Sequence, residues 1–295
     1  MVRESRFRNP EFQEKLARAR RYERKTGLYF SWRSFIILGL FLTAVYFLAI
    51  SKKFLVTQAA VSGTGASAEE ISAVLTRMRN ERFGYVIPRN HILILDEEKL
   101  LFEIQQEFPA VRSISALKKI WPDQIAVAIE ERVPKYVWQS GSDFYLLDQD
   151  GVVFQAIASY APETFSQALI IDTSAAPVTA GEGLSIKPIL EFVSRAKDAW
   201  QTHINQAGLV HFSVPGGKSQ DILVKTTIGF NVLFDLERDP VEQLENLKIL
   251  LNREILPETH GGLSYIDLRL PHMAYYCYKD APCAPEYATS TQPSI

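Results

Sequence analysis

The segment VRSISALKKIWPDQIAVAIEER, residues 111–132, carries the pattern that decides the fold class of this chain. Apolar and polar residues alternate over 111–120 and again over 124–132, which is the period of half-buried β-strands. The tripeptide Trp-Pro-Asp separates the two runs, so the segment predicts a β-hairpin. The residues on either side indicate what this hairpin belongs to.

Two helices are predicted before the hairpin. Residues 67–79, SAEEISAVLTRMR, begin with a serine N-cap and a glutamate three residues later, which is a capping box. Residues 96–108, DEEKLLFEIQQEF, begin with an aspartate N-cap, carry apolar residues on one face and stop before a proline. With a strand at 54–63, the order becomes β-α-α-β-β over 54–132, a small α+β unit with a three-stranded sheet.

An uncharged run, SFIILGLFLTAVYFLAIS, occupies residues 34–51. At about 1.5 Å per residue it covers roughly 27 Å, close to the minimum for crossing a bilayer. Residues 1–33 carry ten Lys or Arg and four Asp or Glu, although the whole chain has a net charge of −2. The positive-inside rule therefore predicts a cytoplasmic segment at 1–33, a transmembrane helix at 34–53 and the remainder outside the cytoplasm.

Two other structures could contain such an uncharged run. A buried core helix is disfavoured because the run has no polar stripe. A cleaved signal peptide is disfavoured because the positive segment before the run is long, and because Lys52 and Lys53 follow without an adjacent small-x-small site. The stretch TQAAVSG, residues 57–63, is a weak cleavage candidate.

After the hairpin the sequence predicts a mixed, mostly antiparallel β domain with two helices, over residues 133–280. Its short apolar runs predict strands at 135–139, 143–148, 151–157, 209–214, 221–227 and 229–236. The helices are expected at 186–200 and 240–255, the second opened by an aspartate cap and a proline. No element is assigned to 158–183. The stretch LSYIDLRLPHMAYYCYKD, residues 263–280, closes the domain, and residues 281–295 are expected to form a flexible tail.

No motif predicts catalysis. Residues 215–219, PGGKS, end like a phosphate-binding loop, but residue 212 is Phe where that loop needs Gly, and a strand follows instead of a helix. The histidines have no ligand-like spacing, and no nucleophile-elbow pattern frames a serine. The acidic outer part disfavours nucleic acid. We therefore predict no catalytic residue, no metal, no cofactor and no small-molecule substrate.

Cys277 and Cys283 are six residues apart, with turn-forming residues between them. A disulfide between them is feasible in an oxidising compartment. Sequence alone does not establish the required Cα geometry, so the pairing stays open.

The order of these segments resembles the FtsQ/DivIB family of bitopic bacterial cell-division proteins. EFPAVRSISALKKIWPDQIAVAIEERVPKYVW (107–138) is similar to the family's P-x-V, R/K-x-x-P and E-R-x-P-x-x-x-W patterns, YLLDQDGVVF (145–154) to its D-x-x-G-x-V-F hairpin, and YIDLRL (265–270) to its closing segment. The motif positions in this sequence are Glu131, Arg132, Pro134, Asp148, Gly151, Asp267 and Arg269.

The resemblance implies a POTRA-like domain at 54–132, an FtsQ-type β domain at 133–280 and no enzymatic activity. It implies a divisome scaffold at the division septum that recruits FtsB/DivIC-like and FtsL-like proteins and helps regulate septal peptidoglycan synthesis. In the family, the last strand of the β domain receives a strand from FtsB. The matching partner-binding positions are Leu270, His272, Met273, Ala274, Tyr275, Tyr276 and Tyr278.

An edge strand left open for a partner would explain the tyrosine-rich end of the domain. The alternative is that these tyrosines pack on the domain's own helices. Pro271 departs from the family pattern and is expected to bulge the strand and shift its register. The two cysteines are a second departure.

Three other functional classes stay open: a POTRA-bearing secretion or assembly factor, a membrane-tethered hydrolase and an anchored ligand sensor. The first would usually carry POTRA repeats or an outer-membrane barrel. The hydrolase would need a cleft with convergent titratable residues, and the sensor a sizeable apolar pocket.

Overall fold

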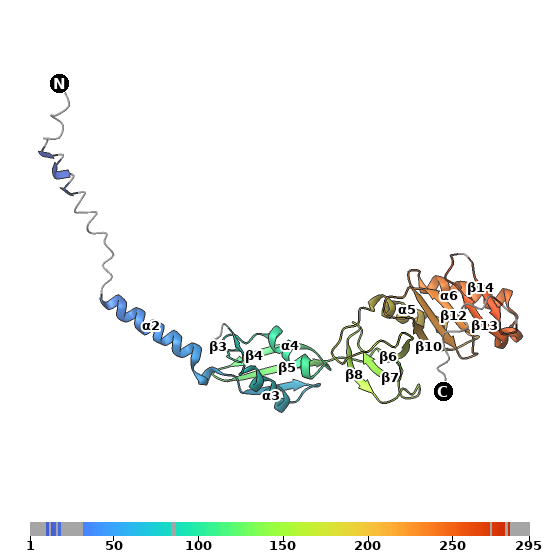
Figure 1. Cartoon of the computed structure of the whole chain (residues 1–295), viewed down its shortest axis with the longest axis horizontal. Coiled ribbons are helices and arrows are strands. Elements are labelled where there is room, and N and C mark those ends of the chain that lie inside the picture. The colour runs from blue at the N-terminus through green and yellow to red at the C-terminus, as the bar shows by residue number, and fades with distance from the viewer. Residues whose placement is uncertain are drawn as a thin grey trace, which may run out of the picture.

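The computed structural model describes residues 10, 11, 13–15, 17, 18, 32–83, 87–271, 273–280 and 283. These residues form an apolar helix followed by two packed units in a row (Figure 1). Most of the predicted basic segment and nearly all of the predicted C-terminal tail lie outside the described residues.

The apolar helix α2 (Trp32–Ile50) contains an 18-residue window, Trp32–Ala49, of which 0% is buried inside the protein. Within the described ranges it is the one helix long and apolar enough to cross a membrane. A helix that is apolar all round and unburied does not fit the interior of a soluble domain, so the core-helix alternative is excluded.

The smaller unit follows directly, and its three-stranded sheet packs against two helices (Figure 1). Its elements are β1 (Gln58–Gly63), α3 (Ala68–Met78), β2 (Arg82–Phe83), β3 (Ile87–Pro88), α4 (Glu97–Glu107), β4 (Val111–Ile120) and β5 (Gln124–Glu131). The described residues order the sheet as β1-β5-β4, with β1 parallel and β4 antiparallel to β5. This is the order expected from the sequence, with the β2–β3 hairpin in addition.

The caps expected from the sequence place these two helices. The Ser67 hydroxyl accepts the Glu70 N–H at 3.2 Å, and the Glu70 carboxylate accepts the Ser67 N–H at 2.7 Å, which forms the capping box. Asp96 accepts the Lys99 N–H at 2.9 Å at the start of α4. The helices so placed bury a shared apolar core against β4 and β5, made of Ile71, Val74, Leu75, Met78, Leu100, Ile104, Ile114, Ile125, Val127 and Ile129.

The larger unit contains one long mixed sheet and two helices (Figure 1). Its elements are β6 (Tyr136–Ser140), β7 (Asp143–Leu147), β8 (Val153–Ile157), β9 (Ala168–Asp172), α5 (Lys187–His203), β10 (Leu209–Val214), β11 (Asp221–Thr226), β12 (Asn231–Asp235), α6 (Pro240–Ile249), the π turn η3 (Leu250–Glu254), the 3-10 turn η4 (Pro257–Gly262), β13 (Leu263–Asp267) and β14 (Tyr275–Tyr278). The described residues order the nine strands as β14-β13-β12-β11-β10-β9-β6-β7-β8.

The two helices make two of the three parallel pairings in this sheet possible. β9 and β10 are parallel, as are β12 and β13. Parallel neighbours need a crossover, which α5 and α6 provide for these two pairs. The third parallel pair, β6 and β9, is connected through β7 and β8. Both helices bury apolar side chains in the core of this unit, including Phe192 and Trp200 of α5 and Leu244 and Leu247 of α6. The predicted mixed, mostly antiparallel sheet is therefore present.

Two sequence expectations need correction. The sequence predicts no element over 158–183, yet β9 lies there in the middle of the sheet, with four of its five residues buried. Its run ALIID is a short buried parallel strand, which lacks the alternation that identifies half-buried strands. The helix expected over 240–255 ends at Ile249 and continues as the π turn η3.

The two units are joined by Arg132, whose guanidinium forms an ion pair with Asp148. The Arg132 and Asp148 side chains are 11% and 3% exposed. Arg132 Nε also donates to the Pro109 carbonyl at 3.1 Å, and the Arg132 N–H donates to the Ala110 carbonyl at 2.8 Å. This one side chain thus connects the end of β5 to the loop before β4 and to the larger unit.

The Asp148 turn shows why this loop has its sequence. Asp148 Oδ1 accepts the N–H groups of Asp150 and Val152, each at 2.9 Å. Gly151 has φ +80°, and a Cβ there would lie 3.1 Å from the Leu184 carbonyl oxygen. The D-x-x-G spacing therefore builds the turn and presents the second Asp148 oxygen to Arg132.

We expect Arg132→Met to lower the free energy of unfolding by about 3 kcal/mol, because it leaves the Asp148 carboxylate buried without its counter-charge. The measurement is urea unfolding of the full chain in detergent micelles, followed by tryptophan fluorescence. The matched control is Arg112→Met. It removes an exposed pair in which Arg112 Nη2 and Asp150 Oδ2 are 3.3 Å apart and the side chains are 43% and 51% exposed. The control should cost less than about 1 kcal/mol, and equal losses would contradict the assignment.

Candidate functional site

The last strand of the chain, β14, forms one edge of the nine-stranded sheet. Its neighbour is β13, which it pairs with in antiparallel register from Asp267–Tyr275 to Leu263–Tyr278. In the part of the chain that the structure describes, no strand pairs with its outer side. The backbone groups on that side have no strand partner among the described residues.

The opposite edge of the same sheet is closed by the chain itself. At β8, the Val153 N–H donates to the Glu182 carbonyl at 2.9 Å, and the Gly181 N–H donates to the Val153 carbonyl at 2.7 Å. A bridge between Val152 and Gly183 continues this contact. The two edges of the sheet thus differ in that β8 has a covering segment among the described residues and β14 has none.

The register of β14 identifies which backbone groups face outward. The Lys279 N–H donates to the Gly262 carbonyl at 2.8 Å, on the β13 side. In an antiparallel pair the N–H and C=O of one residue point the same way, and the direction alternates along the strand. Tyr275 and Cys277 therefore direct their backbone groups toward β13, whereas Tyr276 and Tyr278 direct theirs outward.

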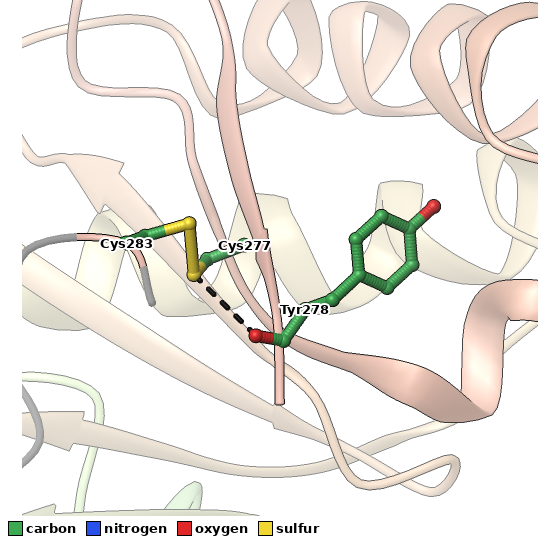
Figure 2. The surroundings of a disulfide bond; sticks show 3 residues. All are labelled: Cys277, Tyr278 and Cys283. Atoms are coloured by element: carbon green, nitrogen blue, oxygen red, sulfur yellow. Dashed lines mark hydrogen bonds between the residues drawn. A yellow bond between two sulfur atoms is a disulfide. The ribbon is translucent and has the colours of Figure 1, made fainter. Parts of the chain in front are cut away.

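A disulfide joins Cys277 to Cys283, with the Cα atoms 5.9 Å apart (Figure 2). This separation is ordinary for a disulfide, and the structure thereby settles the pairing that the sequence left open. Cys277 Sγ lies 3.5 Å from the Tyr278 carbonyl oxygen. A disulfide sulfur has no proton to donate, so this contact is not a hydrogen bond. The bond holds Cys283 close to β14.

The side chains predicted to bind a partner fall into two groups. Leu270, Met273, Tyr275 and Tyr276 are 45%, 55%, 53% and 40% exposed. Ala274 and Tyr278 are half-buried and pack against the core of the larger unit. His272 lies outside the described residues.

Tyr278 is held by its own domain. Its hydroxyl lies 3.1 Å from Thr259 Oγ1, and its ring meets the Tyr276 ring edge-on with the centroids 5.9 Å apart. The interpretation that the tyrosines pack internally therefore fits Tyr278, while Tyr275 and Tyr276 remain exposed. Thr259 belongs to η4. In the same turn, the Gly261 carbonyl oxygen accepts a hydrogen bond from Lys279 Nζ at 2.9 Å. Sequence reasoning missed this support, because short 3-10 turns have no periodic pattern.

Arg269 stabilises the end of β13. Its Nη1 lies 2.9 Å from Asp221 Oδ2, and its Nε and Nη2 donate to Asp267 at 2.9 and 2.6 Å. Burial by itself would raise the pKa of Asp267, but the hydrogen bonds and charge of Arg269 outweigh it, so that the pKa is lowered. The ionised pair holds the chain where it leaves the strand.

Pro271 does not bulge a strand, which corrects the expectation from the sequence. β13 ends at Asp267 and β14 begins at Tyr275, so Pro271 lies in the connection between them. The register shift occurs between Leu263 and Tyr265 instead. The proline is tolerated because a connecting residue needs no ladder hydrogen bond.

The remaining motif residues lie at the junction of the two units. Glu131 closes β5 opposite Val111, and the Pro134 carbonyl accepts Gln167 Nε2 at 3.4 Å. A groove of about 700 Å³ runs between the units, lined by Arg112, Glu130, Glu131, Arg132, Val133 and Phe154 among others. Among the described residues, no three His, Cys, Asp or Glu side chains gather closely enough to hold a metal ion.

Comparison with known proteins supports the resemblance seen in the sequence. Residues 136–269 match the family model described as "Cell division protein FtsQ/DivIB, C-terminal". This match spans β6 to β13 and stops before β14. A protein named "Cell division protein FtsQ" from Chloroflexus aurantiacus is 26% identical over 238 residues, which cover 80% of this chain and 78% of that protein. Residues 136–269 therefore form a domain of the FtsQ/DivIB type, and the chain as a whole resembles the FtsQ/DivIB family of cell division proteins.

Proposed function

We propose that this protein is a non-enzymatic divisome scaffold that captures a partner strand at the open edge of β14. The proposed partners are FtsB/DivIC-like and FtsL-like bitopic proteins, and through them the protein helps regulate septal peptidoglycan synthesis. Resemblance to the family supports a role in cell division and with divisome partners in general. The unpaired outer side of β14 is the observation that carries the specific proposal.

The proposed arrangement places residues 1–33 in the cytoplasm, 34–53 in the cytoplasmic membrane and the rest outside, at the division septum. Residues 54–132 would be a POTRA-like domain, 133–280 an FtsQ-type β domain and 281–295 a tail. The unburied apolar helix supports a single membrane span. The Cys277–Cys283 disulfide supports an oxidising compartment for the C-terminal end.

Strand addition uses the backbone for affinity and alternate side chains for specificity. The outward N–H and C=O groups of Tyr276 and Tyr278 would pair with the incoming strand. Each such hydrogen bond contributes about 1 kcal/mol net, so β14 alone offers modest affinity. Anchoring both proteins in one membrane raises their effective concentration and offsets this weakness.

Tyr275 and Tyr276 supply the side-chain part of the proposed site. Neighbouring residues of a strand point to opposite faces, so one ring lies on each side of the sheet edge. Both are exposed among the described residues, and both are large and amphipathic with only two rotatable bonds to order. A partner strand beside β14 would therefore meet an aromatic contact on either face.

The backbone part of this proposal is tested by comparing Tyr276→Pro with Tyr276→Ala. Both substitutions remove the ring, but only proline also removes the outward N–H. We expect the proline variant to bind about tenfold more weakly than the alanine variant, because the partner carbonyl loses its donor. Affinity is measured with the full chain in nanodiscs and the external segments of the organism's FtsB-like and FtsL-like proteins.

Hydrogen exchange at Cys277 and Lys279 serves as the control, because their N–H groups bond to β13 and should stay protected in both variants. Equal affinities of two variants with β14 still paired would place the partner elsewhere. If the unmodified chain binds neither partner, the divisome-scaffold proposal fails and the POTRA-bearing assembly factor becomes the better interpretation.

Cys283→Ser tests whether the disulfide stabilises the binding edge. Closing this short loop stabilises the chain by roughly 2 kcal/mol in the loop-entropy model. We expect the N–H groups of Tyr275, Cys277 and Lys279, which face β13, to exchange roughly 30-fold faster in the variant, since 1.4 kcal/mol corresponds to a factor of ten. Adding a reductant to the unmodified protein should give the same increase. Unchanged exchange in both samples would show that β14 is held without the disulfide.

A further inference from the structure

We propose that the membrane-proximal end of the smaller unit rests on the outer surface of the bilayer that α2 enters. The contact is made by a membrane-facing patch, defined as Leu93, Lys118, Lys119, Ile120 and Trp121. Its partner is the headgroup layer of that bilayer, with its anionic phospholipids. The inference depends on α2 spanning the membrane, but not on β14 or on the identity of any division partner.

The end of α2 is attached to the smaller unit by a side chain. His91 Nε2 lies 2.9 Å from the Leu48 carbonyl oxygen, in the last turn of the helix. A carbonyl at a helix C-terminus has no partner within the helix, so the imidazole satisfies it. His91 is 1% exposed and belongs to the loop that precedes α4. The unit therefore begins where the helix ends.

Phe54 contacts both His91 and the tip of the β4–β5 hairpin, and so connects the end of α2 to that tip. It belongs to the 3-10 turn η2 (Lys52–Phe54), which follows α2 directly. Its ring centroid lies 6.0 Å from that of His91 and 5.8 Å from that of Trp121. One ring contact thus separates Trp121 from the residue where the chain leaves the helix.

The sheet register places the whole hairpin turn at this end. β1 and β5 are parallel and begin together, with Gln58 opposite Gln124. The Thr57 N–H donates to the Asp123 carbonyl at 3.1 Å, just before this pair. The turn that contains Trp121 therefore lies level with the chain as it emerges from α2, on the side of the unit facing the helix (Figure 1).

The chemistry of the patch fits a headgroup layer. Trp121, Leu93 and Ile120 are 56%, 52% and 39% exposed, which is unusual for large apolar side chains gathered at one end of a small unit. Tryptophan favours the membrane–water interface, where its ring is apolar and its N–H stays hydrated.

Four exposed lysines lie at the exit of α2 or directly before Ile120. Lys52 and Lys53 lie at the exit of α2, and Lys118 and Lys119 lie at the end of β4; all four are exposed. Among the described residues none of the four forms an ion pair with a carboxylate, and Asp123 is the acidic residue within the turn. Each lysine close to an anionic bilayer surface strengthens binding to that surface by roughly fivefold.

Continuity with α2 favours the bilayer over a protein occupant. A protein partner must diffuse to the patch, whereas the bilayer surface begins where the spanning helix ends. Docking at this point would limit the tilt of the smaller unit. Through the Arg132–Asp148 pair it would also limit the tilt of the larger unit.

The test is quenching of Trp121 by a lipid in vesicles that contain the full chain. Trp32→Phe is introduced first, because Trp32 lies at the other end of α2. Trp138 and Trp200 remain, but they are each 2% exposed and lie in the larger unit. Phosphatidylcholine with a spin-labelled headgroup then quenches those tryptophans that touch the headgroup layer.

We expect several-fold more quenching in the Trp32→Phe chain than in the same chain with Trp121→Phe added. Flotation of the vesicles confirms that α2 is inserted, which separates a failed span from a failed contact. The emission of the two buried tryptophans shows that both variants are folded. Equal quenching of the two inserted, folded chains would overturn the proposal.

The charge contribution is tested with Lys118→Glu/Lys119→Glu in the Trp32→Phe chain. In vesicles of equal parts phosphatidylcholine and phosphatidylglycerol, we expect docking to weaken by at least roughly 25-fold. In phosphatidylcholine alone the effect should be smaller. Lys187→Glu/Lys248→Glu, which changes exposed lysines of the larger unit, is the matched control and should have no effect. Equal quenching of both double variants in anionic vesicles would overturn recognition of anionic lipid.

Discussion

The hydrogen-bonding requirement of sheet edges governs the larger unit of this protein. A mixed sheet has two edges, and each presents a row of N–H and C=O groups without partners. At β8 the chain returns through Gly181–Gly183 and pairs with the edge. At β14 no described segment does so, although η4 and a disulfide hold the strand in place. An edge that is well supported but unpaired is suited to receiving a strand.

The junction between the two units depends on the side chain of a single arginine. One buried guanidinium, that of Arg132, pairs with Asp148 and also binds the carbonyl of Pro109. The conformation of Gly151 makes the Asp148 turn possible. Because a buried ion pair is costly to break, the two units are coupled more firmly than the exposed charges of the junction alone would allow. The orientation of the smaller unit therefore influences where the edge of β14 is presented.

Local signals in the sequence predicted most of the architecture. The capping box at Ser67, the Asp96 cap and the alternation over 111–132 identified the elements of the smaller unit, because these interactions lie within a few residues of one another. The apolar run of α2 and the motif residues around Arg132 were likewise visible. β9 was missed, because a buried parallel strand shows neither alternation nor helical period.

By itself, the sequence determined the apolar helix, the order of the two units and the tyrosine-rich end of the chain, since periodicity, caps and charge are local properties. Only the tertiary structure decided that β14 lies at an edge, that Tyr278 packs inward while Tyr276 stays exposed, and that Cys277 is bonded to Cys283. Strand order, burial and the distance between two Cα atoms depend on residues far apart in the chain. No local pattern records those distances, so the candidate site became visible only when the sheet was assembled.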